Sequence, residues 1–297
     1  MYRNILVPVD GSKLAERALT VAVTLAEQHG ARLVLLQVHP SIARRTGGGG
    51  VPVRDPALDL TWRADQLRGL DRLANRLRKR TAVVVDAVFR DGETVPTILD
   101  EVAKQDAGLV VMVTHGRGGF QRFFLGSVSD GLMRRITVPL LLLRAGRAAA
   151  KQHEGASLFR RVLVPLDGSE RAERALPAVQ GFRDGQPTEL TLAHVVHPMS
   201  AMAAAHLGQK PAEESEETYL EPIAARMRTT QQTVACKAVV DGQVARALMQ
   251  LATERDADLI ALTTQGMSGF QRLVVGSVAD KLVRAAAQPV LLCPSGE

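Results

Sequence analysis

Two carboxylates and two glycine-serine pairs occupy matching places in this 297-residue chain and have the chemistry of a nucleotide site. Asp10 and Asp167 each end an aliphatic run, and Gly126-Ser127 and Gly276-Ser277 each precede an amphipathic stretch. Glycines at a helix start expose backbone N–H groups that bind phosphate. A carboxylate repels phosphate, so it should accept hydrogen bonds from the ribose or base. A nucleotide meets both demands.

The two predicted phosphate sites differ in charge. His115-Gly116-Arg117 in the first half can supply an amide, a titratable ring and a cation, and we expect Ser127 to cap the following helix. The second half has Gln265-Gly266-Met267 at the matching place. One lost charge-assisted hydrogen bond is worth about 1.5–3 kcal/mol, so we expect the N-terminal site to bind more tightly.

The chain repeats itself, and the repeat predicts two domains. The octet that contains Asp10 recurs 157 residues later around Asp167, and the segment that contains Gly126 recurs 150 residues later around Gly276. The first half is therefore longer, and we assign its excess to a glycine-rich loop over 44–52. A small, polar and basic linker over 145–158 joins the halves. We expect domains over residues 1–146 and 158–297.

Short aliphatic runs alternate with longer amphipathic stretches, which is typical of βαβ units. We predict an α/β fold with two tandem open parallel sheets of the Rossmann-like type, each with about five strands and helices on both faces. Strands are predicted near 4–9, 32–38, 81–88, 108–113, 138–143, 161–166, 189–196, 233–240, 258–263 and 289–293. Helices of the first half are predicted near 13–29, 58–79, 93–105 and 127–136.

Three prolines test this pattern. Pro8 and Pro165 fall in strands that would be central, where a missing ladder donor is unfavourable. Pro177 falls beyond the first turn of a helix that starts near Glu170, so we expect a kink or a late helix start there.

The paired motifs resemble the universal stress protein family in its tandem form. The resemblance rests on the opening Ile5 to Ser12 (ILVPVDGS), the closing Gly-x9-Gly-Ser loop, and the Val-Pro-Leu-Leu-Leu-Leu run over 138–143. It covers about residues 1–144 and 159–295. It implies an adenine nucleotide alpha hydrolase-like fold, ATP as ligand with or without Mg2+, an internal pseudo-dimer through the final strands, and a possible homodimer.

The resemblance also implies particular contacts. Asp10 and Asp167 would meet adenosine, and Val38 and Val195 would lie beside adenine. ATP-binding members share Gly-x2-Gly-x9-Gly-Ser/Thr, but Val113 or Thr263 replaces the first glycine here. The full set of expected contacts is Pro8, Val9, Asp10, Val38, Val113, His115, Gly116, Arg117, Gly126, Ser127, Val128, Pro165, Asp167, Val195, Thr263, Gly266, Gly276, Ser277 and Val278.

Composition limits the alternative functions. The charge of +6 permits contact with nucleic acid, but the chain has only 3% aromatic residues and lacks a groove-reading motif. No run approaches the roughly 20 apolar residues of a membrane helix, and no signal-peptide core follows Met1. We therefore expect a cytoplasmic protein that binds neither membranes nor nucleic acid. Cys236 and Cys293 are expected to be buried, reduced thiols.

Binding is a better prediction than catalysis. Phosphoryl transfer needs a metal and a positioned base, and the chain has no Walker lysine or kinase signature. No catalytic or metal-ligating residue is assigned, and the resemblance implies at most weak ATP hydrolysis or autophosphorylation. We expect an ATP-binding regulatory protein of the stress response. Val113 and Thr263 favour the alternative, a stress-response scaffold whose degenerate sites bind no nucleotide.

Overall fold

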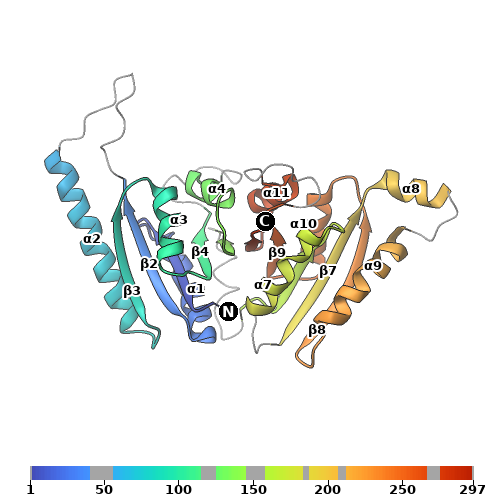
Figure 1. The fold of residues 1–297 in the computed structure, drawn as a ribbon, viewed down its shortest axis with the longest axis horizontal. Coiled ribbons are helices and arrows are strands. Elements are labelled where there is room, and N and C mark those ends of the chain that lie inside the picture. The colour runs from blue at the N-terminus through green and yellow to red at the C-terminus, as the bar shows by residue number, and fades with distance from the viewer. Residues whose placement is uncertain are drawn as a thin grey trace, which may run out of the picture.

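A computed structural model describes residues 2–40, 56–114, 125–144, 158–182, 187–206, 212–265 and 275–295. One ten-stranded sheet runs through the molecule in the order β3-β2-β1-β4-β5-β10-β9-β6-β7-β8 (Figure 1). All strand pairs within each half are parallel, and only β5 and β10 run antiparallel to each other. The α/β fold with two parallel halves is as predicted.

Each half contributes five strands in the same relative order. The first half contains β1 (Asn4–Val9), α1 (Arg17–His29), β2 (Arg32–His39), α2 (Pro56–Arg78), β3 (Val85–Asp91), α3 (Thr94–Lys104), β4 (Leu109–Val113), α4 (Ser127–Met133) and β5 (Leu140–Leu143). The second contains β6 (Arg161–Pro165), α6 (Glu170–Glu173), α7 (Ala175–Phe182), β7 (Thr188–Val196), α8 (Pro198–His206), α9 (Ala212–Met227), β8 (Gln232–Val240), α10 (Val244–Glu254), β9 (Leu259–Thr263), α11 (Ser277–Ala285) and β10 (Val290–Cys293).

The largest differences from the predicted element boundaries are at the starts of β3 and α1. β3 begins at Val85 rather than near residue 81, because the chain leaves α2 through a turn in which Thr81 N–H donates to Leu77 O. Val84 in this apolar run is 64% exposed and precedes the strand, although its carbonyl accepts a hydrogen bond from Leu33 N–H of β2. α1 begins at Arg17 rather than near residue 13, since the preceding residues form turns.

The backbone shows how the chain accommodates Pro177 and Pro165. The helix near Glu170 is interrupted at Arg174, and α7 starts two residues before Pro177, as predicted. Leu166 N–H donates to Ala193 O of β7, so the preceding Pro165 nitrogen faces β9. The ladder from β9 to β6 has already ended at Leu163, and the missing donor therefore interrupts no ladder bond.

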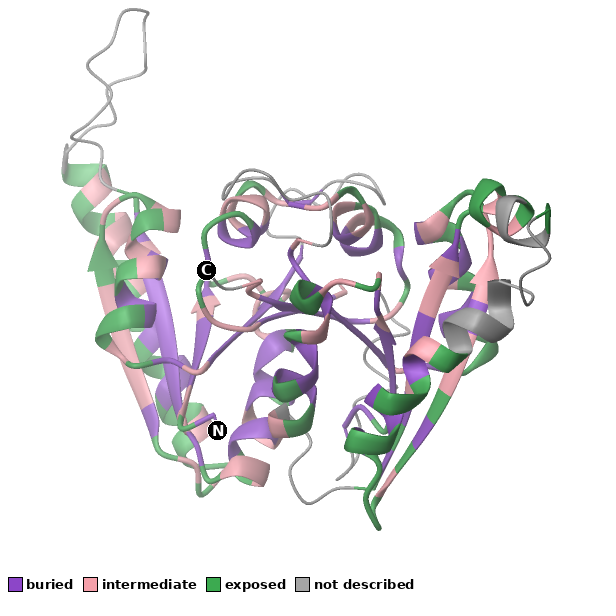
Figure 2. Ribbon diagram, turned by 45° about the vertical axis from the view of Figure 1, so that its right-hand side comes forward, coloured by how far each residue is buried: buried purple, intermediate pink, exposed green. Residues whose placement is uncertain are grey.

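The core lies on both faces of the sheet and is almost wholly aliphatic. One cluster fills the space under α1, α2, α7 and α9, and the other fills the space under α3, α4, α10 and α11. Figure 2 shows the buried strands running through the middle and the exposed outer sides of the helices. Burial on both faces explains the near-continuous Val, Ile and Leu runs of the central strands.

The two halves join through their last strands. Leu140 to Leu142 of β5 pair antiparallel with Leu292 to Val290 of β10, which is the predicted internal pseudo-dimer. The buried Tyr2 hydroxyl also donates to Ala178 O of α7, at 2.9 Å. The predicted loop over 44–52 and nearly all of the predicted linker over 145–158 lie outside the described residues.

Candidate functional site

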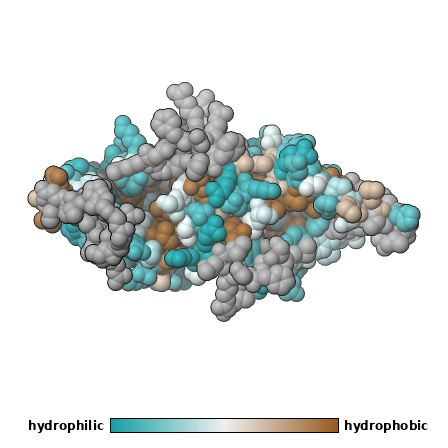
Figure 3. All heavy atoms as spheres, turned by 90° about the horizontal axis from the view of Figure 1, so that it is seen from above, coloured by the Kyte–Doolittle hydropathy of each residue, from teal (hydrophilic) through white to brown (hydrophobic). Residues whose placement is uncertain are grey.

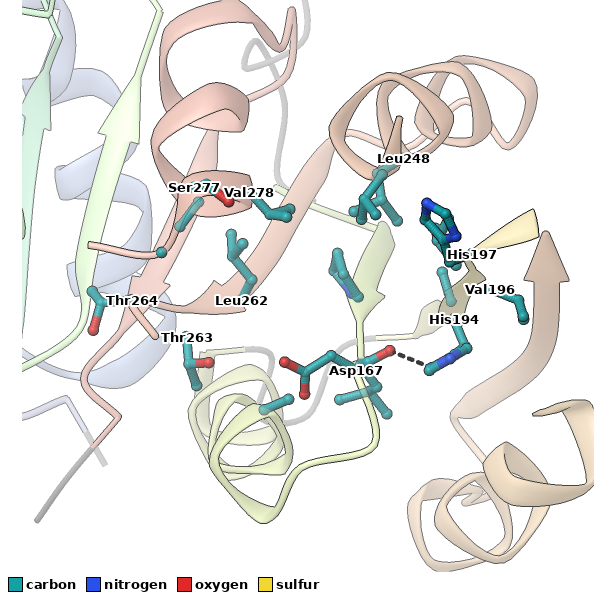
Figure 4. Close-up of a pocket in the computed structure, with 18 of the residues that line it drawn as sticks. Asp167, His194, Val196, His197, Leu248, Leu262, Thr263, Thr264, Ser277 and Val278 are labelled. Atoms are coloured by element: carbon teal, nitrogen blue, oxygen red, sulfur yellow. Dashed lines mark hydrogen bonds between the residues drawn. The ribbon is translucent and has the colours of Figure 1, made fainter. Parts of the chain in front are cut away.

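A cavity of about 390 Å³ opens at the carboxyl ends of the second-half strands. It lies where β6 and β9 separate, which is the switch point at which open parallel sheets bind ligands. β7, α10 and the first turn of α11 complete its walls (Figure 4). Seven of the eight residues predicted for this half line it: Pro165, Asp167, Val195, Thr263, Gly276, Ser277 and Val278. The eighth, Gly266, lies outside the described residues.

The carboxylate wall is shaped by a tight turn. Asp167 Oδ1 accepts hydrogen bonds from Ser169 N–H at 3.1 Å and from Ser169 Oγ at 2.6 Å. Gly168 between them has φ of 87°, a conformation that suits glycine. Asp10 is held in the same way by Ser12 N–H at 2.9 Å. Figure 4 shows the Asp167 carboxylate pointing across the cavity toward Thr263.

The opposite wall is a helix N-terminus. Gly276 is the N-cap of α11, and the first intrahelical bond runs from Asp280 N–H to Gly276 O. The N–H groups of residues 277–279 therefore have no intrahelical acceptor and are available for an anion. Gly126 has the same role in α4, so Ser127 is the first helical residue and the prediction that it caps the helix is wrong.

The position of the first signature glycine is filled by side chains. Val113 is 7% exposed and Thr263 is 6% exposed, each at the end of its strand. Thr263 Oγ1 donates to Gln265 O at 2.8 Å, which turns the hydroxyl toward its own loop. The backbone is thus less accessible to a ligand here than a glycine would leave it.

Sequence reasoning missed two histidines that line this cavity. His194 Nδ1 lies 2.8 Å from Leu166 O, and because a carbonyl only accepts, Nδ1 carries the proton. His197 is exposed at the end of β7. The 157-residue offset places Gln37 and Pro40 at the matching positions of the first half. The available sequence signal was that the two histidines flank Val195, a predicted site residue.

The first-half site is described in part. Pro8, Asp10 and Val38 lie at the ends of β1 and β2, and β4 lies next to β1 as the prediction required. Val38 and Val128 pack on the face of α3 and α4. Val9 and Val113 pack on the opposite face, so their side chains are not brought together with those of Val38 and Val128.

His115, Gly116 and Arg117 lie outside the described residues. Gly126 N–H donates to Thr114 O at 3.1 Å, and Gly276 N–H donates to Thr264 O at 2.8 Å. A Cβ at Gly126 would lie 3.2 Å from Thr114 O, so the close approach of α4 to β4 favours glycine.

Comparison with known proteins decides the family. The sequence model of the universal stress protein family matches residues 1–144 and 158–294. The chain belongs to the universal stress protein family. It is 26% identical to the universal stress protein Rv2005c of Mycobacterium tuberculosis over 298 residues, which cover 97% of this chain and 96% of that one. The universal stress protein YxiE of Bacillus subtilis is 30% identical over 148 residues and matches 48% of this chain over its whole length.

The fold of this universal stress protein is also found in a solved structure. A universal stress protein from Archaeoglobus fulgidus superposes with a TM-score of 0.73 at 20% identity, and each chain is covered completely. Family membership supports a stress-response protein of two domains. The domain limits of 1–146 and 158–297 remain predictions.

Two other observations concern the described residues of this universal stress protein. None of their helices is long and apolar enough to cross a membrane. No three of their His, Cys, Asp and Glu side chains form a group that could hold a metal ion.

Figure 3 shows the molecule from above, which is the side on which α4 and α11 lie. Hydrophilic and hydrophobic side chains alternate across the middle of this face.

Proposed function

We propose that this universal stress protein binds ATP at the carboxyl ends of its strands and acts as a nucleotide-dependent regulator. The observation that carries the proposal is the cavity of about 390 Å³, with Asp167 on one wall and the α11 N-terminus on the other. Those two walls offer acceptors for ribose hydroxyls and donors for phosphate, as a nucleotide requires.

The apolar part of the cavity supports an adenine ring. Val195 of β7, Leu248 of α10 and Val278 of α11 face the same space, and Leu262 of β9 closes it. Flat aromatic ligands bind best where most of their surface contacts apolar side chains and a few polar groups fix their orientation. If Mg2+ accompanies ATP, the phosphate oxygens would supply most of its ligands.

The two sites should differ in affinity. We keep the proposal that the N-terminal site binds more tightly, because His115 and Arg117 are replaced by Gln265 and Met267. His197, which lines the C-terminal cavity, acts against that difference. Its first-half counterpart is Pro40, which has no donor.

A scaffold that binds no nucleotide is the second candidate. Thr263 and Val113 support it, since side chains stand where the family signature has a glycine. In that case the fold would present an interaction surface, and a homodimer of the whole chain would be one way to use it. Binding experiments separate the two candidates, whereas catalysis is no part of either.

The test uses purified full-length protein and matched glycine variants. Mass spectrometry should find adenine nucleotide released from the denatured protein, and calorimetry should detect ATP binding after its removal. Gly126→Ala and Gly276→Ala each alter one site and leave the other as its control. Greater loss in Gly126→Ala supports the proposed difference in affinity. Absence of both released nucleotide and binding heat favours the scaffold.

A further inference from the structure

A second cavity, of about 410 Å³, lies in the first half on the sheet face opposite to Val38. It is enclosed by β1, β2, the turn before α1, and the middle of α2. Successive strand residues point to opposite faces, so Gln37 enters this cavity while Val38 packs toward α3 and α4. The cavity therefore lies on the sheet face opposite to α4, whose N-terminus is proposed to bind the nucleotide phosphates.

The second half shows which side chains fill the corresponding space there. Arg76 pairs with Glu16 at 2.7 Å, and Arg226 pairs with Glu173 at 3.0 Å in the second half. These matched ion pairs set α2 and α9 in the same register, 150 residues apart. That register places Tyr219 at the position of Gly69.

The strands identify the first-half residue that corresponds to the contact partner of Tyr219. β2 and β7 correspond at a 157-residue offset, so His194 stands where the first half has Gln37. The rings of His194 and Tyr219 meet edge to face, with centroids 6.0 Å apart. The first half has therefore exchanged a pair of touching rings for a glycine and a carboxamide, and a cavity results.

Packing does not require a glycine at position 69. Gly69 lies in the interior of α2, where glycine is unfavourable, and a Cβ there would meet nothing within 4 Å. Gln37 is 3% exposed, and its carboxamide, which borders the cavity, makes no hydrogen bond to any of the described residues. A ligand in the cavity could therefore hydrogen-bond to this carboxamide.

The remaining walls indicate the class of ligand. Trp62 offers an aromatic ring, and Leu70 and Leu73 are buried and apolar. At the rim, the guanidinium of Arg72 has no ion pair within the described part of the chain, whereas that of Arg76 is paired with Glu16. Arg72 is thus the cation available to an anionic group on the ligand.

We propose that this cavity binds a small aromatic acid. The ring would occupy the space that Tyr219 fills in the second half and would contact Trp62. A hydroxyl or similar polar group would hydrogen-bond to Gln37, and a carboxylate would pair with Arg72 at the rim.

The single tryptophan of the chain, Trp62, lines the cavity and reports its occupancy by fluorescence. Titration of the full chain with 4-hydroxybenzoate should change the Trp62 emission saturably. Phenol lacks the carboxylate and benzoate lacks the hydroxyl, so each should bind about ten-fold more weakly. No saturable change at about 10 mM of 4-hydroxybenzoate would overturn the proposal.

Variants locate the ligand. Gly69→Tyr restores the residue of the second half and should abolish binding, while Leu67→Tyr, on the outer side of the same helix, should not. Gln37→Leu removes a buried amide and should fold; it should bind benzoate as well as 4-hydroxybenzoate. Wild-type affinity in a folded Gly69→Tyr variant, or an unchanged hydroxyl preference in Gln37→Leu, would contradict the site.

Discussion

Arg284 of α11 lies 3.1 Å from Asp130 of α4, and this ion pair joins the two halves of the chain. Asp130 also pairs with Arg134, four residues later in the chain. In α11, Arg284 also pairs with Asp280, four residues earlier. The side chains of Arg284 and Asp130 are each 32% exposed. Pairs with such exposure contribute at most about 1 kcal/mol, so other contacts must hold the junction.

Arg144 is the stronger polar contact at this junction. Its guanidinium donates to Ala286 O at 2.6 Å and to Arg284 O at 2.7 Å, where the last carbonyls of α11 lack helical partners. Arg144→Met should lower the free energy of unfolding by about 2–3 kcal/mol. Urea denaturation measures this loss, and the exposed Arg160→Ala provides the control, which should change stability by less than about 0.5 kcal/mol.

Glu101 should make the free energy of unfolding depend on pH in the acid range. Burial raises its pKa, but hydrogen bonds from Arg90 and Gln105 outweigh that effect, so the pKa of Glu101 lies below its ordinary value. Because the folded-state pKa is lower than the unfolded value of about 4.3, the stabilisation is complete above that pH. It is lost as the pH falls through the folded-state pKa.

Glu101→Gln should therefore flatten the loss of unfolding free energy between about pH 5 and pH 3. Its exposed neighbour offers a control, since Asp100→Asn should leave the slope as it is in the wild type. Equal slopes for the wild type and Glu101→Gln would show that the Glu101 contacts do not matter for folding.

The two cysteines should differ in reactivity. Cys293 is 1% exposed, and burial raises the pKa of its thiol to about 12. Cys236 is partly exposed, which corrects the prediction that both thiols are buried. A thiol reagent at pH 8 should label one cysteine rapidly in the native protein and the second only after unfolding. Rapid labelling of the native Cys236→Ser variant would contradict this account.

Two helix glycines should respond oppositely to alanine. Gly69→Ala should raise the free energy of unfolding by about 0.5–1 kcal/mol, because no atom lies near the added methyl group. At Gly131 a Cβ would lie 2.8 Å from Val95 Cγ2, where α4 packs on α3. Gly131→Ala should lower stability by about 1 kcal/mol or more. Thermal and urea unfolding of both variants tests the contrast.

Much of the fold could be predicted because each local signal agreed with the whole. The repeated octet around Asp10 and Asp167 and the runs of Val, Ile and Leu were enough to predict the parallel strands, whereas the junction of the two halves was implied by the family resemblance. The start of β3 was missed, since an apolar residue such as Val84 looks the same in a strand and in an exposed turn. Only tertiary contacts distinguish the two.

The candidate site could be predicted in outline and not in detail. Asp167 and Ser277 carry a motif, whereas His194 and His197 belong to no signature and join the cavity only because β7 ends beside it. The cavity at Gly69 was beyond sequence reasoning for a different reason. An empty volume depends on the residues around it, and the exchange with Tyr219 has meaning only once α2 and α9 are placed on their sheets.

Photo-cross-linking with 8-azido-ATP, followed by peptide mapping, tests the central claim most directly. The account predicts labelling of the β7 peptide that contains Val195, next to the proposed adenine position, and its suppression by excess ATP. Suppression should also follow when Gly276→Ala alters the α11 N-terminus. Labelling only at other peptides, or labelling that excess ATP does not reduce, would contradict a nucleotide site in this cavity.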